Sequence, residues 1–489
     1  MKYTSRSLDF APTGVGAPLG MTKRWRFLAI GCVMLGAALG ARGTERERVD
    51  LLVTGGTVVT VDAERRVIEN GAVAIRGERI VAVGPAAELE KKYKARRRMR
   101  AEGRLILPGL INTHTHAAMS LYRGVADDRT LEDWLHNFIF PLEAKFTTKD
   151  FVYWGTLLAA LEMIRGGTTT FTDMYYFEDE VARAAEQAGL RAVAGQTVLD
   201  FPAPDYKTPA EALRGTEEFI ARWKGHALVT PVVAPHSAYT CSAETLKASA
   251  ALAQRTGGPL LIHLAESKGE METVRTKQGQ TPVAYLAGLG VFDVHTLGAH
   301  CIYVDAADRK TLAERGVSCA HNPSSNMMLA AGVSPVPALR AAGIAVGLGT
   351  DGPAGSNNDF NMWEEMDLAA KLQKVTLDNP QALKAVEAFA MATREGARAL
   401  GLEKEIGSLE AGKRADLIVV RRDAPHAVPF YDVYSQVVYS LKASDVETTI
   451  VNGRVVMERG RVLTLDEAAI RGQAERFAAA IRESLKKPQ

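Results

Sequence analysis

The stretch Leu105-Ile-Leu-Pro-Gly-Leu-Ile-Asn-Thr-His-Thr-His116 joins an apolar, strand-like run to two histidines separated by a single residue. Successive side chains of a strand point to opposite faces, so the imidazoles of His114 and His116 share a face and can reach one metal ion. The chain has ten histidines, and such a pair can also arise by chance. The surrounding sequence decides between these two interpretations.

Strand and helix patterns alternate through residues 108–400. Amphipathic helical stretches such as Phe151–Arg165 and Ala243–Gln254 separate eight apolar, strand-like segments. Eight such units predict a (β/α)₈ barrel, whose active site lies at the carboxyl ends of its strands. The expected strands are Leu110–Asn112, Thr168–Asp173, Arg191–Val198, Leu228–Ala234, Leu260–Leu264, Thr296–His300, Val317–His321 and Ile344–Thr350.

Histidine or aspartate stands at or just after six of these eight strand ends. A lone histidine in such a place is more often a satisfied structural residue, whereas six strand ends are hard to obtain by accident. In a closed barrel these side chains converge on one site. They are His114 and His116, His236, His263, His300, His321 and Asp351.

Short alternating strands flank the barrel on both sides. Glycine-broken segments within 49–107 and a matching set within 401–462 predict a small composite β-sandwich built from both ends of the chain. The last segment, residues 463–489, is predicted to form a C-terminal helix from Asp466, with Thr464 as its N-cap.

Residues 1–43 have the order of a secretory signal peptide, because a basic segment at 23–26 precedes a small and apolar run over 27–41. If the signal is used, the protein is exported to the periplasm or secreted; otherwise it is cytoplasmic. Two further alternatives stay open: a retained N-terminal anchor, and a start at Met21 in place of Met1.

Charge and cysteine content exclude several classes of protein. The net charge of +2 gives no reason to expect nucleic acid as a partner. Three cysteines follow the N-terminal segment, Cys241, Cys301 and Cys319, and no Cys-x-x-Cys motif occurs. This argues against a disulfide framework, a zinc ribbon and the nucleobase deaminases that carry Pro-Cys-x-x-Cys.

Several short motifs lie along the barrel part of the chain. They are Pro108-Gly-Leu-Ile-Asn-Thr-His-Thr-His116, Met119-Ser-Leu-Tyr-Arg-Gly124, Pro141-Leu-Glu-Ala-Lys145, His263-Leu-Ala-Glu266, Ala299-His-Cys301, His321-Asn-Pro-Ser-Ser-Asn326 and Gly349-Thr-Asp-Gly352. Together they resemble those of the amidohydrolase superfamily, in particular its mononuclear purine and pyrimidine aminohydrolases. The chain is most similar to the 5′-methylthioadenosine/S-adenosylhomocysteine deaminase family, over nearly all of its length beyond the N-terminal segment.

The resemblance implies one divalent metal ion held by three imidazoles and one carboxylate, those of His114, His116, His263 and Asp351. Zinc is the usual ion for such a set, and Fe²⁺ or Mn²⁺ stay open. Two-metal relatives carry a carboxylated lysine at the end of the fourth strand. Here that strand ends at Val232-Val-Ala-Pro-His236, without a lysine, which favours a single ion.

The implied reaction is hydrolytic deamination of an adenine nucleoside of the 5′-methylthioadenosine, S-adenosylhomocysteine or adenosine type. A metal-bound hydroxide would attack the amino-bearing ring carbon, and ammonia would leave. Glu266, three residues past His263, would protonate the ring nitrogen and then the leaving group. Asp351 would take the proton of the water, and His300 would orient the hydroxide.

The resemblance also implies contacts to the substrate. Glu143 would accept hydrogen bonds from the ribose hydroxyls, His236 would contact the nucleoside and Glu266 its ring nitrogen. Trp134, Met119 and Ser325 are expected to line the pocket, whereas His321 is expected to be structural.

One position departs from the family. Where members that recognise homocysteine carry an arginine after the third strand, this chain has Gln196. An amide cannot form the bidentate charged pair that arginine makes with a carboxylate. An uncharged 5′-substituent is therefore at least as compatible with Gln196 as S-adenosylhomocysteine is.

Two other functions stay open on the sequence. The first is a related amidohydrolase that acts on another ring, such as guanine, cytosine, a pterin or a chlorotriazine. The second is an exported ligand-binding protein without turnover. A homo-oligomer is also compatible with the sequence, since the family often assembles, although no segment indicates it.

Overall fold

The computed structural model describes residues 46–486. The predicted signal peptide, residues 1–43, lies outside this part of the chain. Within residues 46–486, no helix is long and apolar enough to cross a membrane.

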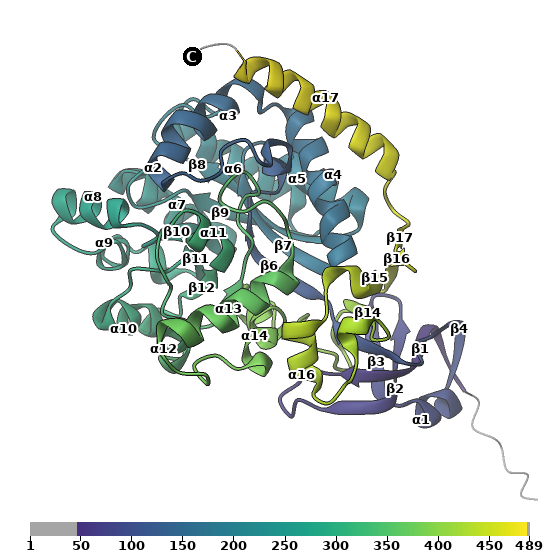
Figure 1. Ribbon diagram of the computed structural model, residues 1–489. Coiled ribbons are helices and arrows are strands. Elements are labelled where there is room, and N and C mark those ends of the chain that lie inside the picture. The colour runs from purple at the N-terminus through teal and green to yellow at the C-terminus, as the bar shows by residue number, and fades with distance from the viewer. Residues whose placement is uncertain (1–45, 487–489) are drawn as a thin grey trace, which may run out of the picture. The chain divides into compact units, whose positions relative to one another are not determined.

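Eight parallel strands close into a barrel, as the alternating pattern predicts (Figure 1). Most of the observed bounds lie within two residues of the expected ones, and β7 and β6 extend two or three residues further at their carboxyl ends. The fold class is therefore confirmed. In barrel order the strands are β6 (Leu110–Thr115), β7 (Thr168–Tyr175), β8 (Arg191–Val198), β9 (Val229–Pro235), β10 (Leu260–Leu264), β11 (Thr296–His300), β12 (Ser318–His321) and β13 (Val346–Leu348).

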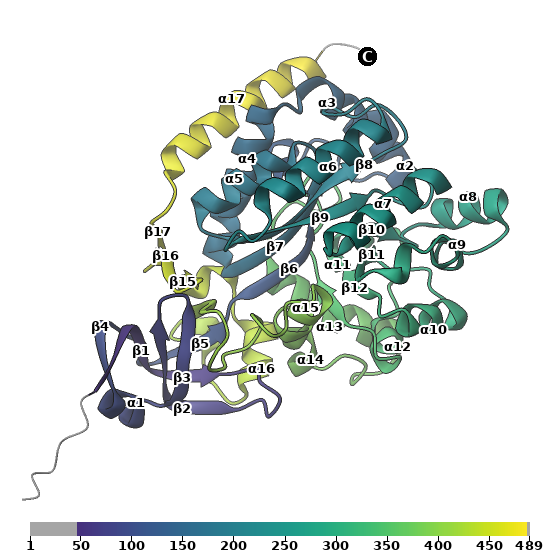
Figure 2. The same ribbon diagram turned by 180° about the vertical axis from the view of Figure 1, so that it is seen from behind.

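Helices surround the strands on the outside of the barrel (Figures 1 and 2). Several begin at a threonine or serine whose side chain accepts a hydrogen bond from the backbone three residues on, as Thr148 does for α4 and Ser242 for α7. The longer ones are α4 (Lys149–Gly166), α5 (Glu178–Ala188), α6 (Pro209–Trp223), α7 (Ala243–Thr256), α8 (Lys268–Gln278), α10 (Ala306–Glu314) and α13 (Met362–Thr376).

Strands from both ends of the chain form one mixed nine-strand sheet, in which β5 pairs with β14. An isolated bridge between Arg79 and Arg414 brings the edge strand β3 back beside the segment that precedes β14, so the sheet curves around its own apolar core. The strands are β1 (Glu47–Val59), β2 (Val67–Arg76), β3 (Arg79–Pro85), β4 (Tyr93–Arg100), β5 (Arg104–Pro108), β14 (Leu417–Arg421), β15 (Val446–Val451), β16 (Arg454–Glu458) and β17 (Arg461–Val462).

The elements of this region that were not predicted include the short helix α1 (Ala86–Lys92) and strand β4. Strand β4 reads Tyr-Lys-Ala-Arg-Arg-Arg-Met-Arg, without the apolar alternation that marks a half-buried strand. It pairs only with β1, so it lies at an edge, where charged side chains stay solvated and discourage pairing with other chains.

The predicted C-terminal helix is present as α17 (Glu467–Leu485), which packs along α4 (Figure 1). The prediction of Thr464 as its N-cap was wrong. The side chain of Asp466 accepts the hydrogen bond from the Ala469 amide, whereas the Thr464 hydroxyl donates to the carbonyl of Ala188. Thr464 therefore ties the segment before the helix to the end of α5.

A buried ion pair joins the barrel to the sheet. Arg191 begins β8, and Asp416 directly precedes β14. The Nη2 of Arg191 lies 3.1 Å from Oδ2 of Asp416, and the two side chains are only 8% and 3% exposed. The Asp416 carboxylate also accepts the Asn452 amide at 2.6 Å. Removal of the guanidinium would leave a buried carboxylate without its countercharge.

We expect Arg191→Met to lower the free energy of unfolding by about 3 kcal/mol or more, because breaking one side of a buried pair strands the other charge. Urea unfolding followed by circular dichroism measures this change. Arg255→Ala is the matched control, since its pair with Glu217 is more than half exposed and should contribute less than about 1 kcal/mol. Equal losses in the two variants would contradict the assigned role of Arg191.

Candidate active site

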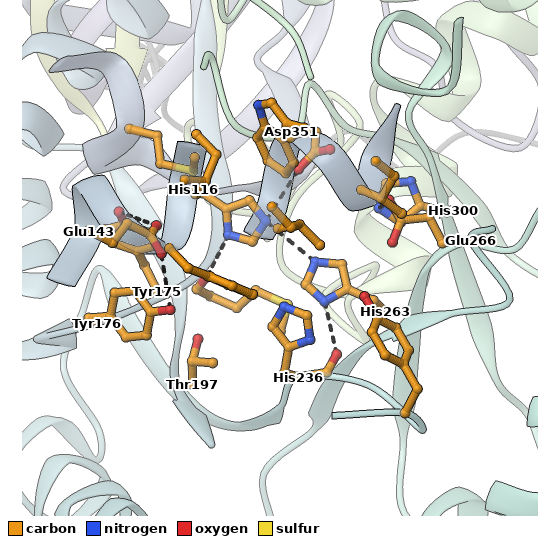
Figure 3. A pocket seen from close by; sticks show the side chains of 18 residues that line it. His116, Glu143, Tyr175, Tyr176, Thr197, His236, His263, Glu266, His300 and Asp351 are labelled. Atoms are coloured by element: carbon orange, nitrogen blue, oxygen red, sulfur yellow. Dashed lines mark hydrogen bonds and ion pairs between the residues drawn. The ribbon is translucent and has the colours of Figure 1, made fainter. Parts of the chain in front are cut away.

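A pocket opens at the carboxyl ends of the barrel strands, where the predicted polar residues converge (Figure 3). Its floor and one side carry most of the predicted histidines and Asp351, and its remaining walls are largely apolar or aromatic. The lining residues are His116, Met119, Leu131, Trp134, Leu135, Ile139, Phe140, Glu143, Met174, Tyr175, Tyr176, Thr197, His236, Tyr239, His263, Glu266, His300 and Asp351.

His114 and His116 lie on the same side of β6 and both face Asp351, as the strand period predicts. The Nε2 atoms of His114 and His116 are 3.4 and 3.2 Å from Oδ1 of Asp351. The Nδ1–H of His116 donates to the carbonyl of Met174 at 2.6 Å. That hydrogen bond orients the Nε2 atom of His116 toward the centre of the cluster.

His263 completes the predicted set from β10. Its Nδ1–H donates to the carbonyl of His236 at 2.9 Å, and its Nε2 lies 3.4 Å from Nε2 of His116. Both rings, those of His116 and His263, donate through Nδ1–H, so their Nε2 atoms face one another with lone pairs. This approach is unfavourable unless a cation or a proton lies between the two Nε2 atoms. The Nε2 atoms of His114 and His300 are also buried and form no hydrogen bond among the described residues.

The spacing of these atoms fits a divalent metal ion. Bonds of the length that zinc makes to nitrogen and oxygen, arranged as a tetrahedron, separate the ligand atoms by about 3.3 Å. Three separations within the predicted set, from Oδ1 of Asp351 to Nε2 of His114 and of His116 and between Nε2 of His116 and of His263, are 3.2 to 3.4 Å. The donor atom of His300 lies within 4.8 Å of those of His114 and His263. The residues present therefore fit a divalent ion, and two overlapping groups, His114 with His263 and His300 and His114 with His116 and Asp351, could hold it.

Burial and the Asp351 carboxylate set the protonation of the cluster. Burial lowers the pKa of His114 to about 4 and that of His263 well below its ordinary value, so both rings are neutral at neutral pH. Burial opposes charge on His116 as well, but the adjacent Asp351 raises the pKa of His116 to about 9. Metal binding requires neutral imidazoles, so an entering ion would displace this proton.

Asp351 is held from two sides. Its backbone has φ of +62°, a left-handed conformation that is uncommon for aspartate. Its amide donates to the carbonyl of His114 at 3.0 Å, and its Oδ2 accepts the hydroxyl of Ser325 at 2.7 Å. Ser325, which is expected from the sequence to line the pocket, is not among the lining residues and instead orients the carboxylate.

Glu266 and His300 lie together beside the cluster. Oε1 of Glu266 is 3.6 Å from Nε2 of His300, and Nδ1–H of His300 donates to Asn326 at 3.0 Å. Burial raises the pKa of Glu266, so this carboxyl group can hold a proton nearer to neutral pH than an exposed glutamate can. The pair thus places a proton carrier and an oriented imidazole at the edge of the metal site.

Glu143 lies on the opposite side of the pocket, on α3 (Phe140–Phe146) (Figure 3). The hydroxyls of Tyr175 and Tyr176 donate to its two carboxylate oxygens at 2.6 and 3.2 Å. Burial raises the pKa of Glu143 to about 7, against these two hydrogen bonds.

Three further predicted residues line the pocket. His236 follows β9, and its Nδ1 is hydrogen-bonded to the hydroxyl of Thr240 at 3.0 Å. The Nε1–H of Trp134 donates to the carbonyl of Ala354 at 2.6 Å, which anchors the indole at the pocket wall. Met119 lies in the turn after β6.

Gln196 and His321, like His114 and Ser325, are not among the residues that line the pocket. The amide of Gln196 donates to Asp205 at 2.7 Å, so its donor group is already used. His321 is fully buried, and neither of its ring nitrogens has a partner among the described residues. Burial lowers the pKa of His321 to about 3, so the ring is a neutral packing element.

Several pocket residues were missed by the sequence analysis. Tyr175 ends strand β7 and Tyr176 follows it. A polar residue at a strand end is the signal that identified the histidines, but aromatic residues there also serve plain packing. Leu131, Leu135 and Ile139 come from α2 (Leu131–Asp133) and η2 (Trp134–Ile139), which lie in the long connection after β6. No barrel pattern predicts where such a connection folds back.

We expect Ser325→Ala to weaken zinc binding by about 10- to 100-fold, because Asp351 loses the donor that orients it. Competition with a chromophoric chelator measures this affinity. Ser324→Ala is the matched control, since the Ser324 hydroxyl forms no hydrogen bond to the metal-binding set within residues 46–486. Zinc affinity that is unchanged in Ser325→Ala would rule out the orienting role.

Comparisons with known proteins identify similar sequences over most of the chain. A model of the amidohydrolase family matches residues 105–456, and a bacterial imidazolonepropionase-like composite domain matches residues 71–93. A 5-methylthioadenosine/S-adenosylhomocysteine deaminase of Syntrophus aciditrophicus is 45% identical over 442 residues, which cover 90% of this chain and 100% of that protein.

Solved structures extend the similarity to the fold. A zinc-bound adenosine deaminase from Xanthomonas campestris is 36% identical, with a TM-score of 0.88 over 90% of this chain and 100% of that one. A zinc-complexed atrazine chlorohydrolase from Arthrobacter aurescens is 25% identical, with a TM-score of 0.81 over 88% and 100% of the two chains. The resemblance found in the sequence motifs is thereby confirmed, and the chain belongs to the amidohydrolase family.

Proposed function

We propose that this protein is a metal-dependent hydrolytic deaminase of adenine nucleosides, with zinc as its ion. The observation that carries the proposal is the placement of two buried carboxyl groups in one pocket. Glu266 lies beside the metal-binding cluster, and Glu143 lies across the pocket from it (Figure 3). The first suits proton transfer to a purine ring, and the second suits hydrogen bonds from a sugar. The names of the similar deaminases support the same assignment.

The proposed reaction forms a carbon–oxygen bond and breaks the bond to the exocyclic amine. A bound divalent ion would supply Lewis acidity and lower the pKa of the attacking water. Glu266 in its protonated form gives a proton to the ring nitrogen next to the reacting carbon, and a proton then passes to the departing amine. Burial of Glu266 favours the protonated form with which this sequence begins.

Asp351 and His300 would act on the attacking water. Burial opposes the charge of Asp351, but the adjacent His114 and His116 hold the pKa of its carboxyl well below the usual value, so it is available as an acceptor. The Nε2 atom of His300 accepts or donates no hydrogen bond among residues 46–486 and lies 3.6 Å from Oε1 of Glu266, and the hydrogen bond to Asn326 fixes its ring. It can therefore orient the water for attack.

The residues that line the pocket favour a substrate whose 5′-substituent is uncharged. Neither lysine nor arginine occurs among the described residues that line the pocket. Leu135, Ile139 and Phe140 present apolar surface instead. With the Gln196 amide bonded to Asp205, the site offers no obvious partner for the carboxylate of S-adenosylhomocysteine. We therefore favour adenosine and 5′-methylthioadenosine as substrates.

The cellular location is a separate proposal. The order of charges and apolar residues in 1–43 supports export, and an exported enzyme would act on nucleosides outside the cytoplasm.

The first test is release of ammonia by the purified, zinc-loaded protein. We expect turnover of adenosine and 5′-methylthioadenosine with a higher kcat/KM than S-adenosylhomocysteine, because the pocket carries no cation for its carboxylate. Guanine and cytosine serve as alternative rings, and a chlorotriazine tests for release of chloride. Chloride release without ammonia, or turnover of another ring alone, would replace the proposed reaction. Nucleoside binding without turnover would indicate a binding protein.

We expect Glu266→Gln to reduce kcat by about 10²- to 10⁴-fold, because the amide cannot transfer a proton to the ring nitrogen. The zinc content, measured by elemental analysis, should stay at the level of the parent protein, since Glu266 is outside the metal-binding set. Glu272→Gln on α8 is a control for loss of one carboxylate away from the lining of the pocket. A kcat within a factor of two of the parent would exclude Glu266 as the proton carrier.

A further inference from the structure

Two consecutive tyrosines hold one carboxylate in the pocket. The Tyr175 hydroxyl donates to Oε1 of Glu143 at 2.6 Å, and the Tyr176 hydroxyl donates to Oε2 at 3.2 Å. Each oxygen of the carboxylate thus has its own phenolic donor (Figure 3). All three residues line the pocket, so the arrangement faces any bound ligand.

Two consecutive residues of a regular strand would not both reach Glu143, so the backbone must depart from a regular strand here. Consecutive residues of a strand point to opposite faces, so two neighbours cannot contact the same group while the strand continues. Tyr175 is the last residue of β7, and its amide donates to Glu178 at 2.7 Å. Phe177 has φ of +51°, and its amide donates to Asp205 at 2.9 Å. This turn brings the Tyr176 ring back beside that of Tyr175, with centroids 4.7 Å apart.

Within the described range 46–486, the two phenols are the only groups that donate to this carboxylate. Glu143 is 4% exposed, and it forms no ion pair with lysine, arginine or histidine within residues 46–486. Hydrogen bonds to the charged form favour that form against the effect of burial. Burial also keeps the pKa of both phenols well above the usual value, so they stay protonated donors. The tyrosines therefore both orient Glu143 and stabilise its charge.

The two tyrosine hydrogen bonds leave the Glu143 carboxylate able to accept further hydrogen bonds. An ionised carboxylate accepts about four hydrogen bonds and donates none. With one acceptor site on each oxygen used by a tyrosine, one on each oxygen remains. Two adjacent free acceptors match two adjacent donors, as in the vicinal hydroxyls of a ribose. A ligand with no hydroxyl there would leave the buried carboxylate undersatisfied, which costs binding free energy.

We propose that Tyr175 and Tyr176 are positioning residues that make the pocket specific for nucleosides with an intact 2′,3′-diol. The inference rests on the proposed nucleoside deaminase activity, in which Glu143 accepts the ribose hydroxyls, and adds the two residues that hold Glu143 in place. The two tyrosines act through Glu143, and neither has to touch the reacting atoms.

The test compares adenosine with 2′,3′-dideoxyadenosine in the zinc-loaded enzyme and its Tyr175→Phe and Tyr176→Phe variants. Each variant loses one hydrogen bond to a charged group, so we expect KM for adenosine to rise about tenfold or more, with kcat little changed. The KM for dideoxyadenosine should change less than twofold. Tyr153→Phe is the matched control, because Tyr153 bonds to Gln187 on the outside of the barrel.

The pH dependence provides a second readout. A lost donor destabilises the charged form of Glu143 and raises its pKa above about 7. The acid limb of kcat/KM for adenosine should therefore move to higher pH in both variants. His116 and Asp205 also act on the Glu143 charge, but they are the same in parent and variants. A packing defect would not move this limb.

Two outcomes overturn the proposal. If KM or kcat changes equally for adenosine and dideoxyadenosine, the tyrosines serve packing alone. If the parent enzyme turns over dideoxyadenosine with the same kcat/KM as adenosine, Glu143 does not discriminate between nucleosides with and without the 2′,3′-diol. Failure of the parent protein to release ammonia from either nucleoside would instead refute the proposed function, so the two failures are distinct.

Discussion

The close approach of the last barrel strand to the first is the contact on which the site depends. A Cβ on Gly347 would lie 2.5 Å from the Thr113 side chain, and one on Gly349 would lie 2.8 Å from Cβ of His114. Larger residues at either position would push β13 away from β6. The amide of Asp351 donates to the carbonyl of His114. The close packing of β13 against β6 therefore places the Asp351 carboxylate next to His114 and His116. The metal-binding set is thus a consequence of barrel register.

Burial without countercharge gives the pocket its chemical character. Within residues 46–486 no lysine or arginine lines it, so its acidic groups depend on histidines and hydroxyls. Asp351 pairs with His116 and stays ionised, whereas the pKa of Glu266 is raised by burial. Acids in one pocket are therefore pushed toward opposite protonation states, the arrangement that separates a proton donor from a proton acceptor. A cation at the cluster would strengthen this separation by replacing the proton of His116.

The parts of the site that could be predicted are those governed by strand period and barrel closure. His114, His116 and His263 end strands, so their convergence follows from the fold. The hydrogen bonds of Ser325 and Gln196 could not be predicted in the same way. Each lies near a strand end in the sequence, but whether its side chain faces the pocket or a neighbouring carboxylate depends on tertiary packing. The charged strand β4 was missed because the edge of a sheet requires no apolar alternation.

The two halves of the pocket are built by different parts of the chain. The metal-binding half is carried by strands whose register is fixed by hydrogen bonds to both neighbours. The substrate half comes from α2, η2 and α3 and from the turn after β7. Connections tolerate sequence change better than barrel strands do. Substitutions in 131–143 or at Tyr175 and Tyr176 can therefore alter which ring or sugar is accepted while the cluster beneath stays intact, which is how one scaffold can serve several substrates.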